Sequence, residues 1–119
     1  MQFKNEKAIY LQITDFVMEK ILRSEWLADQ KIPSVRDFGG ELEVNPNTVM
    51  RAYDILQQQD ILYNKRGLGF FVSPEAKSSI MHIRKKQFIN IELPKFFDTI
   101  TLLGISMDDI NRLYQQKQH

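Results

Sequence analysis

The chain has 119 residues, which suffices for one domain or for one domain with an appendage. Hydrophobic residues make up 43% and charged residues 26%, as in an ordinary globular protein, and there are no cysteines. Disulfides, thiolate metal sites and cysteine nucleophiles are therefore excluded. The sequence lacks an apolar run of membrane-spanning length and the hydrophobic segment of a secretory signal, so we expect a cytoplasmic protein without a membrane partner.

The charge is nearly balanced, at +1. Residues 1–73 carry nine Lys/Arg against ten Asp/Glu, and residues 74–119 carry seven against five. A nucleic-acid-binding surface would therefore depend on where the cations lie, because the bulk charge gives it no support. Such a protein would make few phosphate contacts per subunit and would gain from dimerisation.

Apolar residues at helical spacing predict a first helix from Ile9 to about Arg23, with Tyr10 covering one flank. A polar connector follows, in which we expect Trp26 and Leu27 to lie against the core. Ile32 is expected to be extended, because a residue before proline avoids the helical conformation.

Ser34 is predicted to cap a second helix, with Asp37 completing a capping-box-like pattern. Its core face is expected to hold Val35, Phe38 and Leu42. Arg36 lies in the first turn, where the helix dipole gives its cation no benefit; it either contacts a phosphate or is simply solvated. The pair Gly39-Gly40 costs roughly 1 kcal/mol per glycine in a helix. Close packing against another helix is one explanation, and the role of the pair stays open.

A third helix is predicted from Asn45, as its cap, to about Gln59, with Pro46 at the first helical position. Val49, Ala52, Tyr53 and Leu56 would face inward. The other face would expose Asn47, Thr48 and Arg51, whose amide, hydroxyl and guanidinium groups suit base edges and phosphates. Two helices joined by a short turn predict a helix-turn-helix.

A two-stranded hairpin is predicted next, from β-prone runs at Ile61–Tyr63 and Phe70–Val72 with Gly67 and Gly69 between them. Lys65 and Arg66 would lie at its tip. Charged turns are common, but directly after a helix-turn-helix such a hairpin indicates a wing that reaches the DNA backbone or the minor groove.

Four ordered blocks resemble the GntR family of bacterial winged-helix transcription regulators: residues 9–13, 32–37, 44–49 with 51–52, and 67–72. The resemblance covers about residues 8–73. The Asn-Pro-Asn-Thr motif at residues 45–48 and the short tail further resemble the YtrA subgroup, which has a small helical dimerisation extension and no large effector domain.

The resemblance implies a mainly α fold with a small β-hairpin wing: a winged helix-turn-helix over residues 1–73 and a C-terminal helical dimerisation extension over residues 74–119. It also implies contacts with double-stranded DNA. The matching positions are Ser34, Arg36, Asn45, Asn47, Thr48, Arg51, Gly67 and Gly69. Many members carry Arg where this chain has Pro46 or Met50, which implies a base readout that depends less on arginine.

The tail is expected to be helical, with a kink or restart near Ile91 ahead of Pro94, a stop at Gly104 and a new cap at Ser106 with Asp109. So short a segment cannot bury its apolar residues alone. We expect a symmetric dimer, because its two-fold symmetry would place two copies of the third helix on a two-fold operator. The alternative is a monomer in which the tail forms a helical cap. The expected dimerisation residues are Ile83, Phe88, Ile91, Phe96, Phe97, Ile100, Leu103, Ile110 and Leu113.

The sequence thus predicts a homodimeric, sequence-specific DNA-binding regulator, a repressor acting on an inverted repeat. The alternative is a protein-interaction module docking through Phe88, Phe96 and Phe97, which would leave the polar face of the third helix without a role. An enzyme, a metal site and a cofactor are not expected, because His82 and His119 are the only histidines. The run at residues 84–86 is either solvated or an added phosphate contact. A small apolar effector between subunits, or between tail and wing, stays open.

Overall fold

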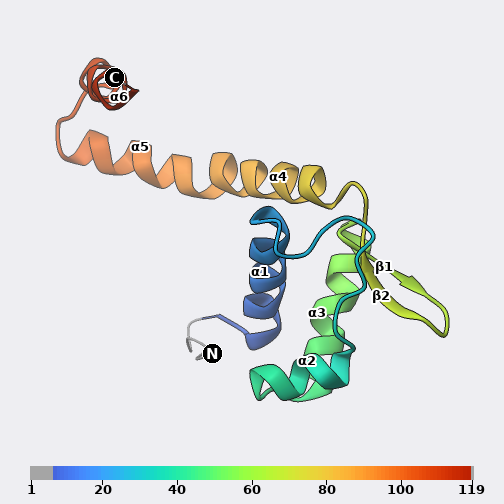
Figure 1. Ribbon diagram of the computed structural model, residues 1–119. Coiled ribbons are helices and arrows are strands. Elements are labelled where there is room, and N and C mark those ends of the chain that lie inside the picture. Colours follow the sequence, from blue (N-terminus) through green and yellow to red (C-terminus); the bar gives the residue numbers. More distant parts are fainter. Residues whose placement is uncertain (1–6, 119) are drawn as a thin grey trace. The chain divides into compact units, whose positions relative to one another are not determined.

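The computed structural model describes residues 7–118. The predicted fold class is confirmed: a mostly helical chain with one two-stranded antiparallel hairpin (Figure 1). The chain divides into two compact units, one ending at His82 and the other beginning at Ile83. In order, its elements are α1 (Ile9–Leu22), α2 (Val35–Leu42), α3 (Pro46–Gln58), β1 (Leu62–Lys65), β2 (Gly69–Val72), α4 (Ala76–Gln87), the π-helix η1 (Phe88–Glu92), α5 (Leu93–Leu102) and α6 (Met107–Gln118).

The core of the first unit forms where α1 and α2 pack against α3. Each helix buries one stripe of apolar residues at the three-and-four spacing seen in the sequence. From α1 these are Ile13, Val17 and Ile21, and from α3 they are Val49, Ala52, Tyr53 and Leu56. Burial of each large side chain contributes about 1.5–3 kcal/mol to the stability of the fold. The predicted inward face of α3 is confirmed.

Phe38 of α2 lies at the centre of an aromatic cluster. Its ring centroid is 5.6 Å from that of Trp26 and 6.2 Å from that of Tyr53. Trp26 is buried, as predicted, but the expectation for Leu27 was wrong, since 56% of it is exposed. A tight turn explains this: the backbone N–H of Leu27 donates to Oε1 of Gln30, and Gln30 donates its own N–H back to the Leu27 carbonyl. The indole enters the core, and the next side chain is left outside.

The hairpin is extended by the segment ahead of α2. β1 and β2 pair in antiparallel register from Leu62 with Val72 to Lys65 with Gly69. Lys31 forms a bridge with Phe71, and the Ile32 N–H donates to the Phe70 carbonyl at 3.0 Å. The predicted extended segment at Ile32 is therefore present, and it attaches the hairpin to the start of the helix-turn-helix.

The second unit begins within α4 and continues through η1 and α5 to α6. Pro94 lies in the first turn of α5, directly after the π-helix. The helix is therefore irregular near Ile91, but it does not restart there, because the backbone stays helical at Glu92 and Leu93. Gly104 ends α5 with a φ of +70°, where the Ile105 N–H donates to the Ile100 carbonyl. Within the described part of the chain, none of the helices combines the length and apolar character that a membrane span requires.

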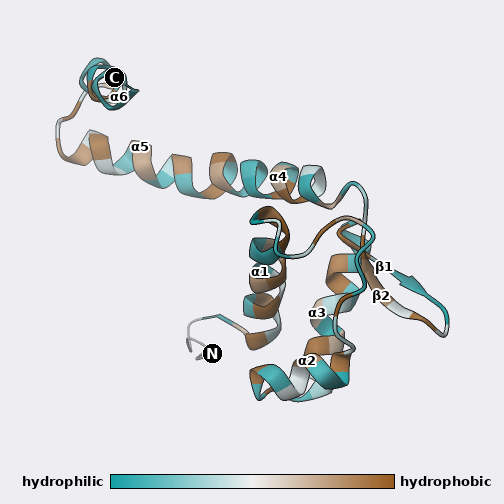
Figure 2. Ribbon diagram, in the orientation of Figure 1, coloured by the Kyte–Doolittle hydropathy of each residue, from teal (hydrophilic) through white to brown (hydrophobic). Residues whose placement is uncertain are grey.

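The cap of α6 is reciprocal, as predicted. The Asp109 N–H donates to Oγ of Ser106 at 3.0 Å, and the Ser106 N–H donates to the Asp109 carboxylate at 3.1 Å. These hydrogen bonds, first of all that from the Ser106 backbone, lower the pKa of Asp109. Figure 2 shows that hydrophobic and hydrophilic residues follow one another along α5 and α6. Many of the large apolar residues on these helices are exposed.

Candidate nucleic-acid interface

The helix-turn-helix of α2 and α3 is held by two side-chain caps. Oγ of Ser34 accepts from the Asp37 N–H at 3.1 Å, and Oδ1 of Asn45 accepts from the Asn47 N–H at 2.8 Å. Both predicted caps are confirmed, and each satisfies a backbone donor that the start of a helix leaves free. Ser34 and Asn45 stay exposed at the starts of these helices.

The turn between the two helices requires a glycine at position 39. Glu43 adopts a left-handed conformation, and the Val44 N–H donates to the Gly39 carbonyl at 2.8 Å. A Cβ on Gly39 would lie 2.7 Å from the Val44 carbonyl oxygen and 3.4 Å from Cα of Pro46. The close neighbours are thus the turn and the first residue of α3. Gly40 has no neighbouring atom within 4 Å of such a Cβ, and nothing in the structure explains it.

The outer face of α3 presents polar groups from its first turns. Asn47 and Arg51 are exposed, and Thr48 between them is half-buried. Arg36, in the first turn of α2, is exposed too. The first turns of α2 and α3 therefore offer solvent an amide, a hydroxyl and two guanidinium groups, which can donate to phosphates and to base edges.

Arg51 has a neighbour that the sequence interpretation did not include in the site. Its guanidinium carbon lies 3.8 Å from the centroid of the Tyr10 ring, in the first turn of α1. The sequence predicts for Tyr10 only that it covers a flank of the first helix. No spacing rule connects residues 41 positions apart, so this pair depends on how α1 packs against α3.

Of the two glycines predicted for the wing turn, Gly67 lies in the turn with a φ of +78°, and Gly69 is the first residue of β2 with a φ of +114°. Both angles favour glycine. Arg66 is exposed in the turn, whereas Lys65 is the last residue of β1. The Lys65 ammonium lies 5.0 Å from the centroid of the Phe71 ring, on the face of the hairpin.

A second cation joins the wing from outside the hairpin. Cε of Lys31 lies 3.2 Å from the position that a Cβ on Gly69 would take. Sequence reasoning missed Lys31, because its place depends on the bridge to Phe71. The base of the wing is fixed by the Tyr63 hydroxyl, which donates to the Asp29 carboxylate at 2.9 Å, and this hydrogen bond is the main cause of the raised pKa of Tyr63.

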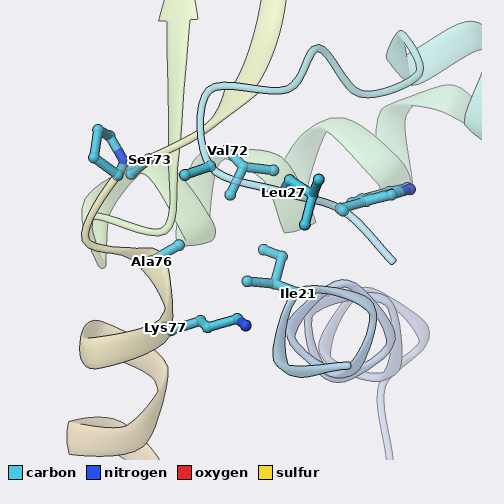
Figure 3. Close-up of a pocket in the computed structure, with 9 residues that line it drawn as sticks. Ile21, Leu27, Val72, Ser73, Ala76 and Lys77 are labelled. Atoms are coloured by element: carbon cyan, nitrogen blue, oxygen red, sulfur yellow. The ribbon is translucent and has the colours of Figure 1, made fainter. Parts of the chain in front are cut away.

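A cavity of about 210 Å³ lies in the first unit, between the end of α1, the loop after it and the start of α4 (Figure 3). Ile21, Leu27, Val72 and Ala76 line it, and Lys77 extends across it to donate to Oγ of Ser24. It is smaller than most ligand pockets, which hold about 300–1,000 Å³. Among residues 7–118, no cluster of three or more His, Asp or Glu side chains could hold a metal ion.

Comparison with known proteins places this architecture in a family. Residues 9–72 match the model of the bacterial regulatory proteins of the gntR family. The HTH-type transcriptional regulator YhcF of Bacillus subtilis is 33% identical over 92% of this chain and 88% of its own. The HTH-type transcriptional repressor YtrA of the same organism is 28% identical over 91% of this chain and 82% of its own.

Solved structures agree with these relatives. A protein from Bacteroides thetaiotaomicron, described as a transcriptional regulator of the GntR family, superposes with a TM-score of 0.81 at 44% identity, over 94% of this chain and all of the other. The AraR DNA-binding domain in complex with its operator ORR3 superposes with a TM-score of 0.56 at 27% identity, over 61% of this chain and 88% of that one. The chain belongs to the GntR family of bacterial regulatory proteins and is a DNA-binding transcription regulator of the winged-helix type.

Proposed function

We propose that this regulator is a cytoplasmic repressor that binds an inverted-repeat operator as a symmetric homodimer. The observation that carries the proposal is the polar outer face of α3, where Asn47 and Arg51 are exposed on a helix held in a helix-turn-helix. A two-fold dimer would present two copies of this face to successive major grooves. Repression is proposed by analogy with YtrA, which is a transcriptional repressor.

The proposed contacts fall into three groups. The first turn of α2, through Ser34 and Arg36, contacts phosphates and sets the register of the protein on the duplex. The first turns of α3 read base edges from the major groove. The side chains proposed to make these base contacts are those of Asn45, Asn47, Thr48 and Arg51.

The wing forms the third group, through Lys65, Arg66 and the backbone at Gly67 and Gly69. To it we add Lys31, whose side chain lies against Gly69. The Lys31 ammonium reaches the phosphate backbone of the DNA in the same operator half-site, next to the contact that the wing turn makes.

Dimerisation is assigned to the tail, residues 74–119, with η1, α5 and α6 supplying most of the surface. Phe88 is 54% exposed, Leu103 is 64% exposed and Leu113 is 59% exposed. Exposed side chains of this size on neighbouring helices favour burial against a second copy. Ile100 is the exception among the residues proposed for this surface, because only 7% of it is exposed and the chain itself already covers it.

The DNA contacts are tested by selecting bound duplexes from random double-stranded DNA and then measuring variants on the selected site. Arg51→Ala is expected to weaken specific binding by about 10- to 100-fold, through lost base or backbone hydrogen bonds. Arg36→Ala should weaken specific and non-specific duplexes alike and reduce the salt slope by about one per subunit.

Arg23→Ala provides the control for charge. Arg23 is exposed and pairs with Glu19 near the end of α1, about 20 Å along that helix from Tyr10. Its removal should leave the affinity for the selected duplex within about twofold. The proposed interface is wrong if no duplex is selected, or if Arg23→Ala weakens binding as much as Arg36→Ala and Arg51→Ala do.

A further inference from the structure

The strongest unassigned relationship in the first unit is the stack between Tyr10 and Arg51. The guanidinium carbon lies 3.8 Å from the ring centroid, which is van der Waals contact with the face of the ring. Arg51 is exposed and Tyr10 is half-buried, so the ring is held by the fold while the guanidinium remains at the surface. Across residues 7–118, no ion pair or hydrogen bond holds this guanidinium, so the ring is its one fixed partner.

We propose that Tyr10 is a positioning residue for DNA recognition, which holds the Arg51 guanidinium on its ring so that the N–H edges point away from the protein toward the duplex. The inference rests on the DNA contact proposed above for Arg51. Tyr10 itself donates nothing to the duplex. Its contribution passes entirely through the arginine.

The physical basis is the loss of freedom that binding requires. A long arginine side chain samples many rotamers in solvent, and fixing it on DNA reduces the affinity. A planar guanidinium stacked on an aromatic face has already lost most of that freedom. Its five N–H groups lie in the stacking plane, and they stay available for a bidentate contact at the edge.

The stack also explains why the side chain at position 51 should be arginine rather than lysine. An ammonium is a compact, strongly hydrated charge, and it cannot lie flat on the ring while offering two parallel N–H groups. Arg51→Lys keeps the charge but loses this geometry. The variant should therefore bind the selected duplex nearly as weakly as Arg51→Ala.

The experiment compares Tyr10→Phe with Tyr10→Leu in the full chain, using the duplex selected from random DNA. Both variants fill the half-buried site with an apolar side chain, and only phenylalanine keeps an aromatic face. Phenylalanine should leave the affinity within about twofold, whereas leucine should lower it by about 3- to 10-fold per subunit. The thermal unfolding temperature of each variant is measured first. Binding is then measured well below the lower of these two temperatures, so that both variants are folded.

A double-mutant comparison assigns the effect to Arg51. In an Arg51→Ala background, Tyr10→Leu should cause no further loss beyond about twofold, because the ring then has nothing to position. Equal losses in the two backgrounds would overturn the proposal, since Tyr10 would then act without Arg51. An equal loss with Tyr10→Phe and Tyr10→Leu would also overturn it, because the hydroxyl would be the contributing group.

These outcomes are separate from those of the proposed DNA interface. If Arg51→Ala weakens binding and Tyr10→Leu does not, the interface stands and the positioning role is wrong. If Arg51→Ala leaves binding unchanged, the interface is wrong at that position and the role of Tyr10 falls with it.

Discussion

The Tyr53 hydroxyl donates a hydrogen bond to the Pro33 carbonyl at 2.8 Å and so joins the middle of α3 to the residue that precedes the cap of α2. Burial, with a smaller contribution from the Glu41 carboxylate, raises the pKa of Tyr53 well above its ordinary value. The hydroxyl therefore stays protonated and keeps donating at neutral and moderately alkaline pH. This bond helps to fix the helix-turn-helix as one rigid body.

Tyr53→Phe removes this hydrogen bond while keeping the ring contacts with Phe38 and Phe70. The free energy of unfolding should fall by about 1 kcal/mol, because the Pro33 carbonyl loses its donor. Urea denaturation followed through the fluorescence of Trp26, the only tryptophan, measures the change. An unchanged midpoint would show that solvent replaces the bond at no cost.

The two neighbouring glycines of α2 should respond in opposite directions to alanine. Gly39→Ala places a methyl group 2.7 Å from the Val44 carbonyl oxygen, so the turn must shift and stability should fall by about 1–3 kcal/mol. Gly40→Ala meets open space and should raise stability by about 0.5–1 kcal/mol through helix propensity. Differential scanning calorimetry of the two variants tests the contrast, which fails if both shift the transition the same way.

A charge on the apolar face of α5 should separate the proposed dimer. Phe97 is 43% exposed, and Phe97→Asp would bury a carboxylate in the subunit interface, so we expect a monomer by sedimentation velocity. Asp98→Lys changes the charge of the same helix at a position that has no proposed dimerisation residue three or four places away, so it should leave the mass unchanged. If Phe97→Asp stays at the wild-type mass, the tail does not dimerise through this face.

The cap of α6 should depend on pH in a defined direction. The pKa of Asp109 is lowered in the folded chain, so its stabilising effect is complete above the ordinary value of 3.8 and is lost as the pH falls through the lowered value. Ser106→Ala removes the hydroxyl partner and should move the pKa of Asp109 back toward that ordinary value. An NMR titration of the Asp109 carboxyl measures both forms, and identical titrations would contradict the account.

What could be predicted from the sequence was largely local. The caps at Ser34 and Asn45, and the pair Ser106 with Asp109, involve side chains and backbone groups within three residues of each other. The buried stripes of α1 and α3 follow the helical repeat, which is also local. These features therefore followed from spacing alone.

The remaining features depend on contacts between distant segments. Leu27 is the exception, because its misplacement has a local cause: the side chain of Gln30, three residues later, fixes its turn. Lys31 reaches the wing only through pairing with Phe71, and Tyr10 meets Arg51 only because α1 packs on α3. No periodicity in the sequence encodes such pairs, so the site residues that sequence reasoning missed were those assembled by tertiary packing.

The π-helix at Phe88–Glu92 acts as a one-residue insertion in the helical repeat. Residues on its two sides are offset by about 100° from where an unbroken α-helix would put them. Which apolar side chains of η1 and α5 share a face is thus fixed by the number of residues between them as much as by their identity. Deleting a single residue of η1 would leave every phenylalanine and isoleucine of α4 and α5 in the sequence. It would nevertheless rotate Phe96 and Phe97 around the helix axis relative to the residues of α4.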